Sequence, residues 1–148
     1  SLYSFSILKG RGDTIKKGDI TIIDDTYNAN LASMKCGIEN LEFKKNKGQN
    51  IVLIIGDMLD LGEDSKDLHS ELGEYISGLN FIDSVYCVGK ESRYVIENIN
   101  NKKINLKLFI DINSIITFLN NYDNSNTIFY IKGSRGMYME KIIEKVFN

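Results

Sequence analysis

The chain has 148 residues, of which 43% are hydrophobic and 26% are charged, and its formal net charge is −2. This composition is typical of one globular domain, and it excludes the broad basic field with which proteins hold nucleic acid. No apolar run is long enough to cross a membrane, and the N-terminus lacks the layout of a signal peptide. We therefore expect one cytoplasmic, monomeric domain over residues 1–148.

The two cysteines, Cys36 and Cys87, match no zinc-binding or redox-motif spacing. We expect both to be reduced and to behave as small buried hydrophobic side chains.

Short apolar runs alternate along the chain with segments of helical periodicity. Strands are predicted over residues 20–23, 51–55, 85–88, 106–110 and 127–131. Helices are predicted over residues 31–41, 68–79, 95–99, 112–119 and 139–146. Asn30 is placed to cap the first helix, and Gly48 is placed to stop it. The less regular residues 1–19 can form an added hairpin or edge strand.

This alternation predicts right-handed βαβ units. The fold class is therefore α/β: a three-layer, Rossmann-like domain with a mostly parallel sheet of about six strands and helices on both faces. Ligands of such sheets bind at the carboxyl ends of the strands, so function is sought in the residues that follow each strand.

The first buried strand ends in the segment 24–30, which has the sequence Asp-Asp-Thr-Tyr-Asn-Ala-Asn. A carboxylate in this segment can accept both hydroxyls of a ribose, because its two oxygens match a vicinal diol. Asn28 and Asn30 supply neutral donors near a helix N-terminus, where phosphate oxygens bind well. The plainer interpretation is a turn and a helix cap.

Two later strands also end in polar segments. Residues 56–63 combine glycines with Asp57 and further acidic residues, which can bind a cation or simply face solvent. His69, the only histidine, lies one turn into the next predicted helix. His69 can act as a structural hydrogen-bonding residue that orients this loop.

Residues 132–136, Lys-Gly-Ser-Arg-Gly, follow the last strand and can hold a carboxylate or phosphate through Lys132 and Arg135. The alternative is an exposed helix cap. The chain has no phosphate loop, no Gly-x-Gly-x-x-Gly motif and no complete catalytic triad, so we expect no complete catalytic apparatus and no metal site of its own.

Three blocks stand in order along the chain: residues 23–30 with Ser33 and Met34, residues 56–62 with His69 and Gly73, and residues 132–137 with Met139 and Glu140. Together they resemble the signatures of the C-terminal domain of the Mur ligase family, in its branch that adds D-alanyl-D-alanine. Gly10-Arg11 resembles the pair at which these ligases pass from the central to the C-terminal domain. Leu31 stands where the family has proline, a change that we expect to reduce rigidity and leave the chemistry unchanged.

The resemblance implies an ATP-dependent ligase of peptidoglycan synthesis with three domains, of which the N-terminal UDP-sugar domain and the central ATPase domain are absent from this chain. ATP phosphorylates the terminal carboxylate of UDP-N-acetylmuramoyl-tripeptide, and the amine of D-alanyl-D-alanine attacks the acyl phosphate. ATP and Mg²⁺ are held mainly by the central domain, so the isolated chain is expected to be inactive.

The resemblance also implies residue roles. Asp25 is expected to hold the ATP ribose, Arg11 to approach the terminal phosphates, and Asn28 and Asn30 to lie beside the nucleotide. The dipeptide is assigned to Lys132, Ser134 and Arg135. Asp57 and His69 are expected to support the loop that faces the cleft.

Two alternatives remain open at this point. One is a phosphoacceptor receiver domain built on Asp24, Asp25, Asp57 and Lys132, although the separations between these residues fit that family poorly. The other is a free-standing α/β module that binds a nucleotide or peptide and never belonged to a ligase.

Overall fold

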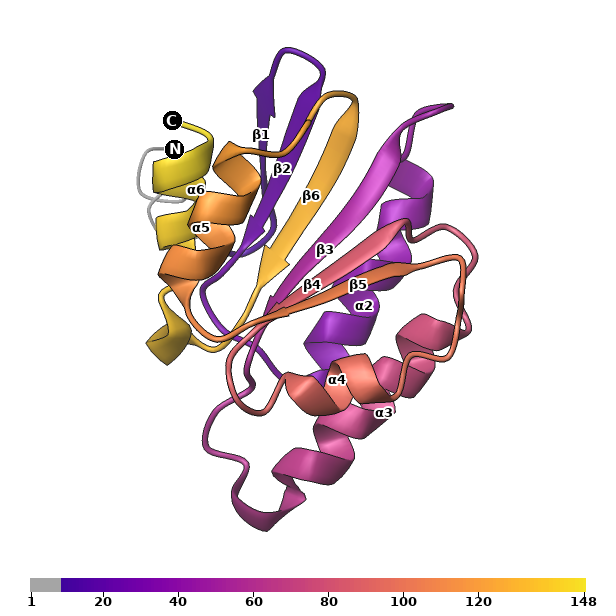
Figure 1. Cartoon of the computed structure of the whole chain (residues 1–148), viewed down its shortest axis with the longest axis vertical. Helices are drawn as coiled ribbons and strands as arrows, with labels where there is room; N and C mark the ends of the chain where they lie inside the picture. Colours follow the sequence, from indigo (N-terminus) through magenta and orange to yellow (C-terminus); the bar gives the residue numbers. More distant parts are fainter. Residues whose placement is uncertain (1–8) are drawn as a thin grey trace.

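A six-stranded sheet with the order β1-β2-β6-β3-β4-β5 runs through the middle of the molecule (Figure 1). The computed structural model describes residues 9–148, so the part of the N-terminal prediction that concerns residues 1–8 lies outside it. β1 pairs with β2 in the antiparallel sense, and all other pairs are parallel. The strands are β1 (Asp13–Lys17), β2 (Ile20–Asp25), β3 (Asn50–Gly56), β4 (Ser84–Val88), β5 (Asn105–Phe109) and β6 (Thr127–Lys132).

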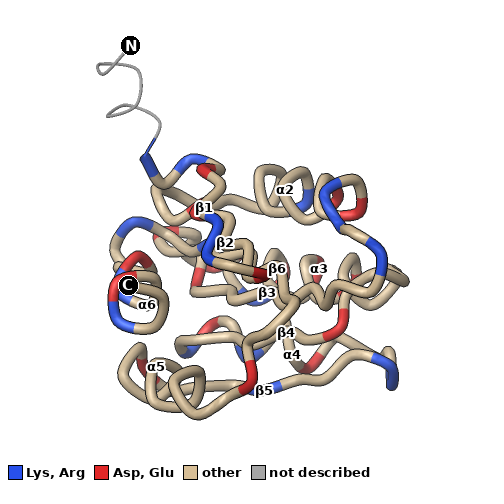
Figure 2. The backbone as a smooth tube through the Cα atoms, turned by 90° about the horizontal axis from the view of Figure 1, so that it is seen from above, with Lys and Arg blue, Asp and Glu red and all other residues tan. Residues whose placement is uncertain are grey.

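Helices cover both faces of the sheet, as Figure 2 shows from above. One face carries α2 (Leu31–Lys44), α3 (Ser65–Ser77) and α4 (Arg93–Glu97), and the other carries α5 (Ile112–Asn120) and α6 (Glu140–Val146). Two short 3₁₀ turns, η1 (Gly62–Asp64) and η2 (Arg135–Met137), precede α3 and α6. The predicted three-layer α/β fold, with its mostly parallel sheet, is confirmed.

Two separate cores result from the alternation of side chains along each strand. In β3, Ile51, Leu53 and Ile55 pack beneath α2, α3 and α4, whereas Val52 and Ile54 pack beneath α5 and α6. Both faces of this strand are buried, which explains its continuous apolar run. The described chain thus carries complete cores of its own on both sides of the sheet.

The irregular start of the chain forms a β-hairpin at one edge of the sheet. Lys17 pairs directly with Ile20, so the connection is the two-residue turn Gly18-Asp19, and Gly18 adopts φ +62°. Turns of this length favour positive φ at the first central residue, which glycine accepts without strain.

Helix α2 begins and ends by different means. Asn30 caps it, because the Asn30 side chain accepts from Ser33 N–H while the Ser33 hydroxyl accepts from Asn30 N–H, which forms a capping box. The predicted stop at Gly48 was wrong: α2 ends at Lys44, and Gly48 lies in the following turn with φ +83°.

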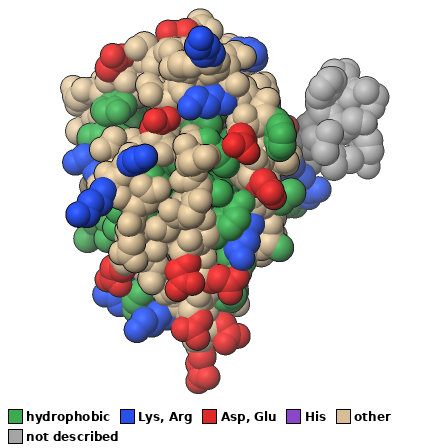
Figure 3. All heavy atoms as spheres, turned by 90° about the vertical axis from the view of Figure 1, so that its right-hand side faces the viewer, with side chains coloured by type: hydrophobic (Ala, Val, Ile, Leu, Met, Phe, Trp, Pro, Cys, Tyr) green, Lys and Arg blue, Asp and Glu red, His purple; other side chains and the backbone are tan. Residues whose placement is uncertain are grey.

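No helix within residues 9–148 is long and apolar enough to cross a membrane. Lys and Arg side chains are scattered over the face drawn in Figure 3, and acidic side chains gather at its lower end, where Figure 1 places the loop between β3 and α3. That end carries the exposed residues Asp60, Glu63, Asp64 and Asp67.

The two cysteines differ in exposure, so the prediction that both are buried was wrong for one of them. Cys87 lies in β4 and is fully buried, whereas Cys36 is exposed because it lies off the buried stripe of α2 formed by Met34, Ile38 and Leu41. Burial and the charge of Asp57 raise the pKa of the Cys87 thiol.

This difference predicts the reactivity of the thiols towards Ellman's reagent at neutral pH. Cys36 should react within minutes in the folded chain, and Cys87 only after a denaturant exposes it, because the reactive species is the accessible thiolate. Cys36→Ser should remove the fast reaction and leave the slow one. Two fast thiols in the folded protein would contradict the buried position of Cys87.

Candidate functional site

The two consecutive aspartates at the end of β2 point to opposite faces of the sheet. Asp24 follows Ile22 on the α5–α6 face, where its Oδ1 accepts from the Thr26 hydroxyl at 2.6 Å and from Thr26 N–H at 3.2 Å. Asp25 follows Ile23 on the α2 face. The acidic pair is therefore two separate groups with different surroundings.

Asp25 accepts two hydrogen bonds through a single oxygen. The Tyr130 hydroxyl donates to Asp25 Oδ2 at 2.5 Å, and Lys132 Nζ donates to the same oxygen at 2.9 Å. The parallel register places Asp25 opposite Lys132, and both side chains are largely buried, with exposed fractions of 19% and 5%. Burial, followed by the negative charge of Asp25, raises the pKa of Tyr130 well above its ordinary value.

A pocket of about 250 Å³ opens beside this cluster at the carboxyl edge of the sheet. The Arg11 guanidinium stacks over the ring of Tyr27, 4.0 Å from its centroid. The structure thus brings together the four residues predicted from the sequence to meet a nucleotide, and it adds Lys132. The pocket is lined by Arg11, Asp25, Tyr27, Asn28, Asn30, Ser33 and Lys132.

The two asparagines in this pocket use their side-chain oxygens locally. Asn28 Oδ1 accepts from Ala29 N–H, and Asn30 Oδ1 accepts from Ser33 N–H, both at 2.8 Å. Their NH₂ groups are then the parts that can donate to a ligand.

A second group of contacts fastens the loop that follows β3. His69 is fully buried; its Nε2 accepts from Met58 N–H at 3.0 Å, and its Nδ1 lies 2.7 Å from the Ser65 carbonyl oxygen. These two contacts fit the tautomer with its proton on Nδ1, which then donates to the Ser65 carbonyl. Asp57 Oδ1 accepts from the backbone N–H and the hydroxyl of Ser92, each at 2.7 Å.

The loop after β6 is tied to the loop after β3. Ser134 N–H donates to the Asp57 carbonyl at 3.0 Å, and Ser134 Oγ accepts from Leu59 N–H at 2.7 Å. Ser134 is buried, so this loop is held firmly at its first residues, and its hydroxyl proton is left to donate.

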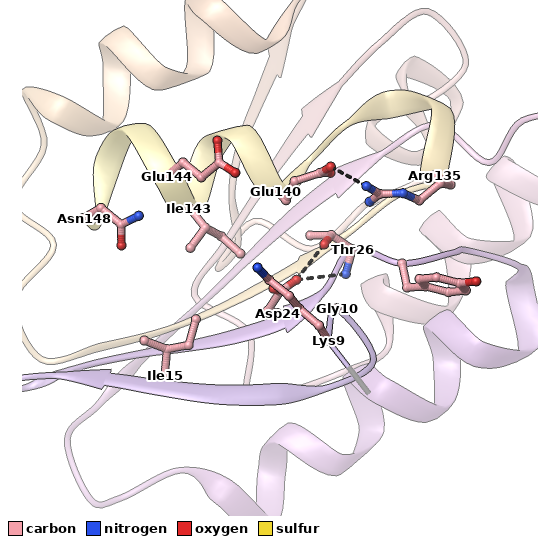
Figure 4. Close-up of a pocket in the computed structure, with 11 residues that line it drawn as sticks. Lys9, Gly10, Ile15, Asp24, Thr26, Arg135, Glu140, Ile143, Glu144 and Asn148 are labelled. Atoms are coloured by element: carbon pink, nitrogen blue, oxygen red, sulfur yellow. Dashed lines mark hydrogen bonds and ion pairs between the residues drawn. The ribbon is translucent and has the colours of Figure 1, made fainter. Parts of the chain in front are cut away.

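Arg135 lies apart from Lys132, on the α6 side of the sheet. Figure 4 shows its side chain directed at Glu140, to which it donates at 2.7 Å, in a second pocket of about 480 Å³ that Asp24 and Thr26 also line. The structure therefore does not bring Lys132, Ser134 and Arg135 together: Lys132 joins Asp25, Ser134 joins the loop after β3, and Arg135 pairs with Glu140.

Two residues of these clusters were not singled out from the sequence. Tyr130 lies inside an apolar strand, where nothing marks its hydroxyl as a polar contact. Ser92 lies four residues after the strand predicted over residues 85–88, in a segment to which the sequence analysis assigned no function. The signal for Tyr130 is Gly37, an isolated glycine inside a helix, which often marks a close approach.

Within residues 9–148, no three His, Cys, Asp or Glu side chains lie close enough together to hold a metal ion. A receiver-type acidic cluster of Asp24, Asp25 and Asp57 is therefore not formed. Asp57 is bonded to Ser92, and Asp24 and Asp25 are on opposite faces.

The mostly parallel α/β fold defines a domain of the Rossmann-like class, with a polar pocket at the carboxyl edge of its sheet, where such domains bind their ligands. The family model "Mur ligase, glutamate ligase domain" matches residues 10–135, and the chain accordingly belongs to the Mur ligase family, as its C-terminal domain. Membership of this family excludes the alternative of a phosphoacceptor receiver domain.

Relatives within that family are UDP-N-acetylmuramoyl-tripeptide–D-alanyl-D-alanine ligases. The chain is 36% identical over 143 residues to the enzyme of Rickettsia prowazekii, covering 97% of this chain and 31% of that one. It is 34% identical over 129 residues to the enzyme of Haemophilus influenzae, covering 84% and 27%. The chain thus spans about a third or less of the length of these relatives.

Solved structures agree with this assignment. MurF ligase from Thermotoga maritima in complex with ADP has a TM-score of 0.74 and 31% identity, over 93% of this chain and 30% of that one. A MurF structure from Acinetobacter baumannii has a TM-score of 0.83, with the same identity and coverage.

Proposed function

We propose that this chain is the C-terminal domain of an ATP-dependent cytoplasmic ligase that joins D-alanyl-D-alanine to UDP-N-acetylmuramoyl-tripeptide in peptidoglycan synthesis. The observation that carries the proposal is the pocket that gathers Arg11, Asp25, Asn28, Asn30 and Lys132 at the carboxyl edge of the sheet. The similarity to full-length ligases, one of them bound to ADP, supports the nucleotide as its ligand.

In this proposal the pocket completes a nucleotide site whose larger part, with Mg²⁺, belongs to the central domain. Asp25 holds a ribose hydroxyl, and Arg11, exposed at the pocket mouth, reaches the terminal phosphates when the domains close. The NH₂ groups of Asn28 and Asn30 donate to the nucleotide. Lys132 acts at this site as well, because its ammonium is paired with Asp25.

We assign the dipeptide to the loops after β3 and β6. The Ser134 hydroxyl retains its proton as a donor, and Arg135, whose side chain is 54% exposed, can release Glu140 to bind a carboxylate. The dipeptide amine would then attack the acyl phosphate of the tripeptide, forming the amide bond and releasing phosphate. Closure of the domains would exclude water, which otherwise hydrolyses the acyl phosphate.

The test is ligation by the full-length protein and by residues 1–148 alone, with ATP, UDP-N-acetylmuramoyl-tripeptide and D-alanyl-D-alanine. We expect amide formation and ATP consumption with the full-length protein when all three substrates are present. Residues 1–148 alone should show neither. A well-folded full-length protein with no dipeptide-dependent turnover would remove the ligase proposal and favour a free-standing binding module.

Replacing Asp25 should weaken ATP use by the full-length enzyme. We expect Asp25→Ala to raise the KM for ATP about tenfold or more, because a hydrogen bond to a charged group contributes about 1.5–3 kcal/mol. The measurement is initial rate against ATP concentration at saturating tripeptide and dipeptide.

Asp25→Asn keeps the volume of the side chain and serves as a second variant, since Asp25→Ala also leaves the buried Lys132 without its counter-ion. Asp67→Ala, on the exposed side of α3, is the control and should leave the KM unchanged. An unchanged KM in both folded Asp25 variants would exclude this role for Asp25.

A further inference from the structure

Tyr130 has a hydroxyl that an ordinary core residue would not need. Its ring is 2% exposed and belongs to the core beneath α2, where its buried neighbours are mostly aliphatic. Burying a hydroxyl is unfavourable unless it finds a partner. Tyr130 lies opposite Ile23 in the register of β6 and β2, and its phenol extends along the strands to Asp25, two residues further on.

The helix above this residue is shaped to admit it. A Cβ atom on Gly37 of α2 would lie 2.0 Å from Tyr130 Oη and 2.7 Å from its Cζ. Any other residue at position 37 would displace the phenol, so the glycine and the tyrosine form one unit that brings a hydroxyl to Asp25. Gly37 and Tyr130 also line a separate pocket, again of about 250 Å³, which Asp25 borders from the α2 side.

The consequence for Asp25 is that one of its oxygens is already occupied. Oδ2 accepts from both Tyr130 and Lys132, which uses its two lone pairs. Among residues 9–148, Oδ1 accepts no hydrogen bond, and Asp25 lines the pocket shared with Arg11 and Asn28. The carboxylate is thus held at one end and open at the other, which differs from the two-oxygen contact expected from the sequence.

We infer that Tyr130 is a positioning residue: with Lys132 it fixes the Asp25 carboxylate so that Oδ1 alone meets one hydroxyl of the nucleotide ribose. This inference rests on the proposed function for the identity of the ligand. It adds that Tyr130 acts through Asp25 without touching the nucleotide, and that Gly37 is needed to place it.

The contact itself can be tested without any activity. In residues 1–148, the Tyr130 hydroxyl, whose oxygen lies 2.5 Å from a carboxylate oxygen of the largely buried Asp25, should give a downfield, slowly exchanging proton signal in NMR spectra. The signal should be lost in Tyr130→Phe and should shift in Asp25→Asn. A wild-type spectrum without such a signal overturns the inference.

The role is tested in the full-length protein with Tyr130→Phe, and with Tyr86→Phe as the matched control. Tyr86 is also a buried tyrosine of the sheet, but it faces the opposite core. Tyr130→Phe should raise the KM for ATP about fivefold and leave kcat within about twofold, because only nucleotide positioning is lost. Tyr86→Phe should change neither constant.

ATP analogues that lack one ribose hydroxyl give a further test, because a purely structural role of Tyr130 would not make the KM depend on which hydroxyl is missing. One of 2′-deoxy-ATP and 3′-deoxy-ATP should show a raised KM with the wild type, and the other should behave as ATP. Equal losses for both analogues, or an unchanged KM in Tyr130→Phe, would overturn the inference. Dipeptide-dependent turnover by the wild type tests the proposed function separately from these comparisons.

Discussion

Gly73→Ala should lower the free energy of unfolding by about 2–3 kcal/mol, which is roughly 5–10 °C in Tm for a domain of this size. Gly73 lies in α3 where that helix meets α4. A Cβ atom there would lie 2.3 Å from the Val95 carbonyl oxygen and 2.9 Å from Asn98 Cβ. The first of these is a backbone atom, so relief requires α4 to move as a whole.

The matched control is Gly78→Ala at the end of the same helix. A Cβ at Gly78 meets only the Tyr75 carbonyl oxygen, at 3.7 Å, and the residue has φ −84°, which alanine accepts. This variant should be neutral or slightly more stable, because it restricts the unfolded chain. The measurement is urea unfolding of both variants followed by circular dichroism. Equal midpoints for the two would show that α3 and α4 are less tightly packed than described.

On titration to alkaline pH, this chain should unfold at a lower pH than its small net charge suggests. Burial raises the pKa of Cys87 above 9.0 and that of Tyr130 above 10.0, and it raises the pKa of Tyr86 to about 12. In the unfolded chain these groups lose their protons near their ordinary pKa values, while in the folded chain they keep them. The folded state therefore binds more protons, and stability falls as pH rises.

The contribution of these groups to the free energy of unfolding is fully present below about pH 9. It decreases above that pH, first because Cys87 and then because the tyrosines lose their protons in the unfolded chain. Each group lowers the free energy of unfolding by about 1.4 kcal/mol per pH unit once its unfolded-state pKa is passed. Urea unfolding between pH 8 and pH 11 measures this loss. Above pH 10, Tyr130→Phe should reduce the slope by about 1.4 kcal/mol per pH unit, and an unchanged slope would contradict a protonated Tyr130 in the folded state.

Most of the fold was predictable because its elements are strongly periodic. The buried runs of β3 and β6 and the apolar stripe of α2 show their structure within a few residues of sequence. The helix predicted over residues 95–99 forms as Arg93–Glu97, and the helix predicted over residues 68–79 begins earlier, at Ser65. Ends of helices depend on caps and packing, which a periodic pattern does not specify.

The candidate site was predictable only where it follows the chain closely. Arg11, Asp25, Asn28 and Asn30 come together because the hairpin and the end of β2 are near in sequence. The predicted grouping of Lys132 with Arg135 does not form, because β6 ends at Lys132 and Arg135 begins the turn η2, where it pairs with Glu140. The contact between Tyr130 and Asp25 joins residues 105 positions apart through a strand register, which no local pattern displays.

The hairpin turn Gly18-Asp19 has a consequence at the opposite end of its strands. Arg11 precedes β1 and Asp25 ends β2, so the turn is about 17 Å from the pocket along strands of this length. Its two residues set the pairing of Asp13 with Asp24 and hence the place of Arg11 beside Asp25. One residue inserted in the turn would make every β1 side chain face the opposite side of the sheet, and it would move the Arg11 guanidinium away from Tyr27 and Asp25. The turn contributes no side chain to the pocket, yet its length determines the position of Arg11 there.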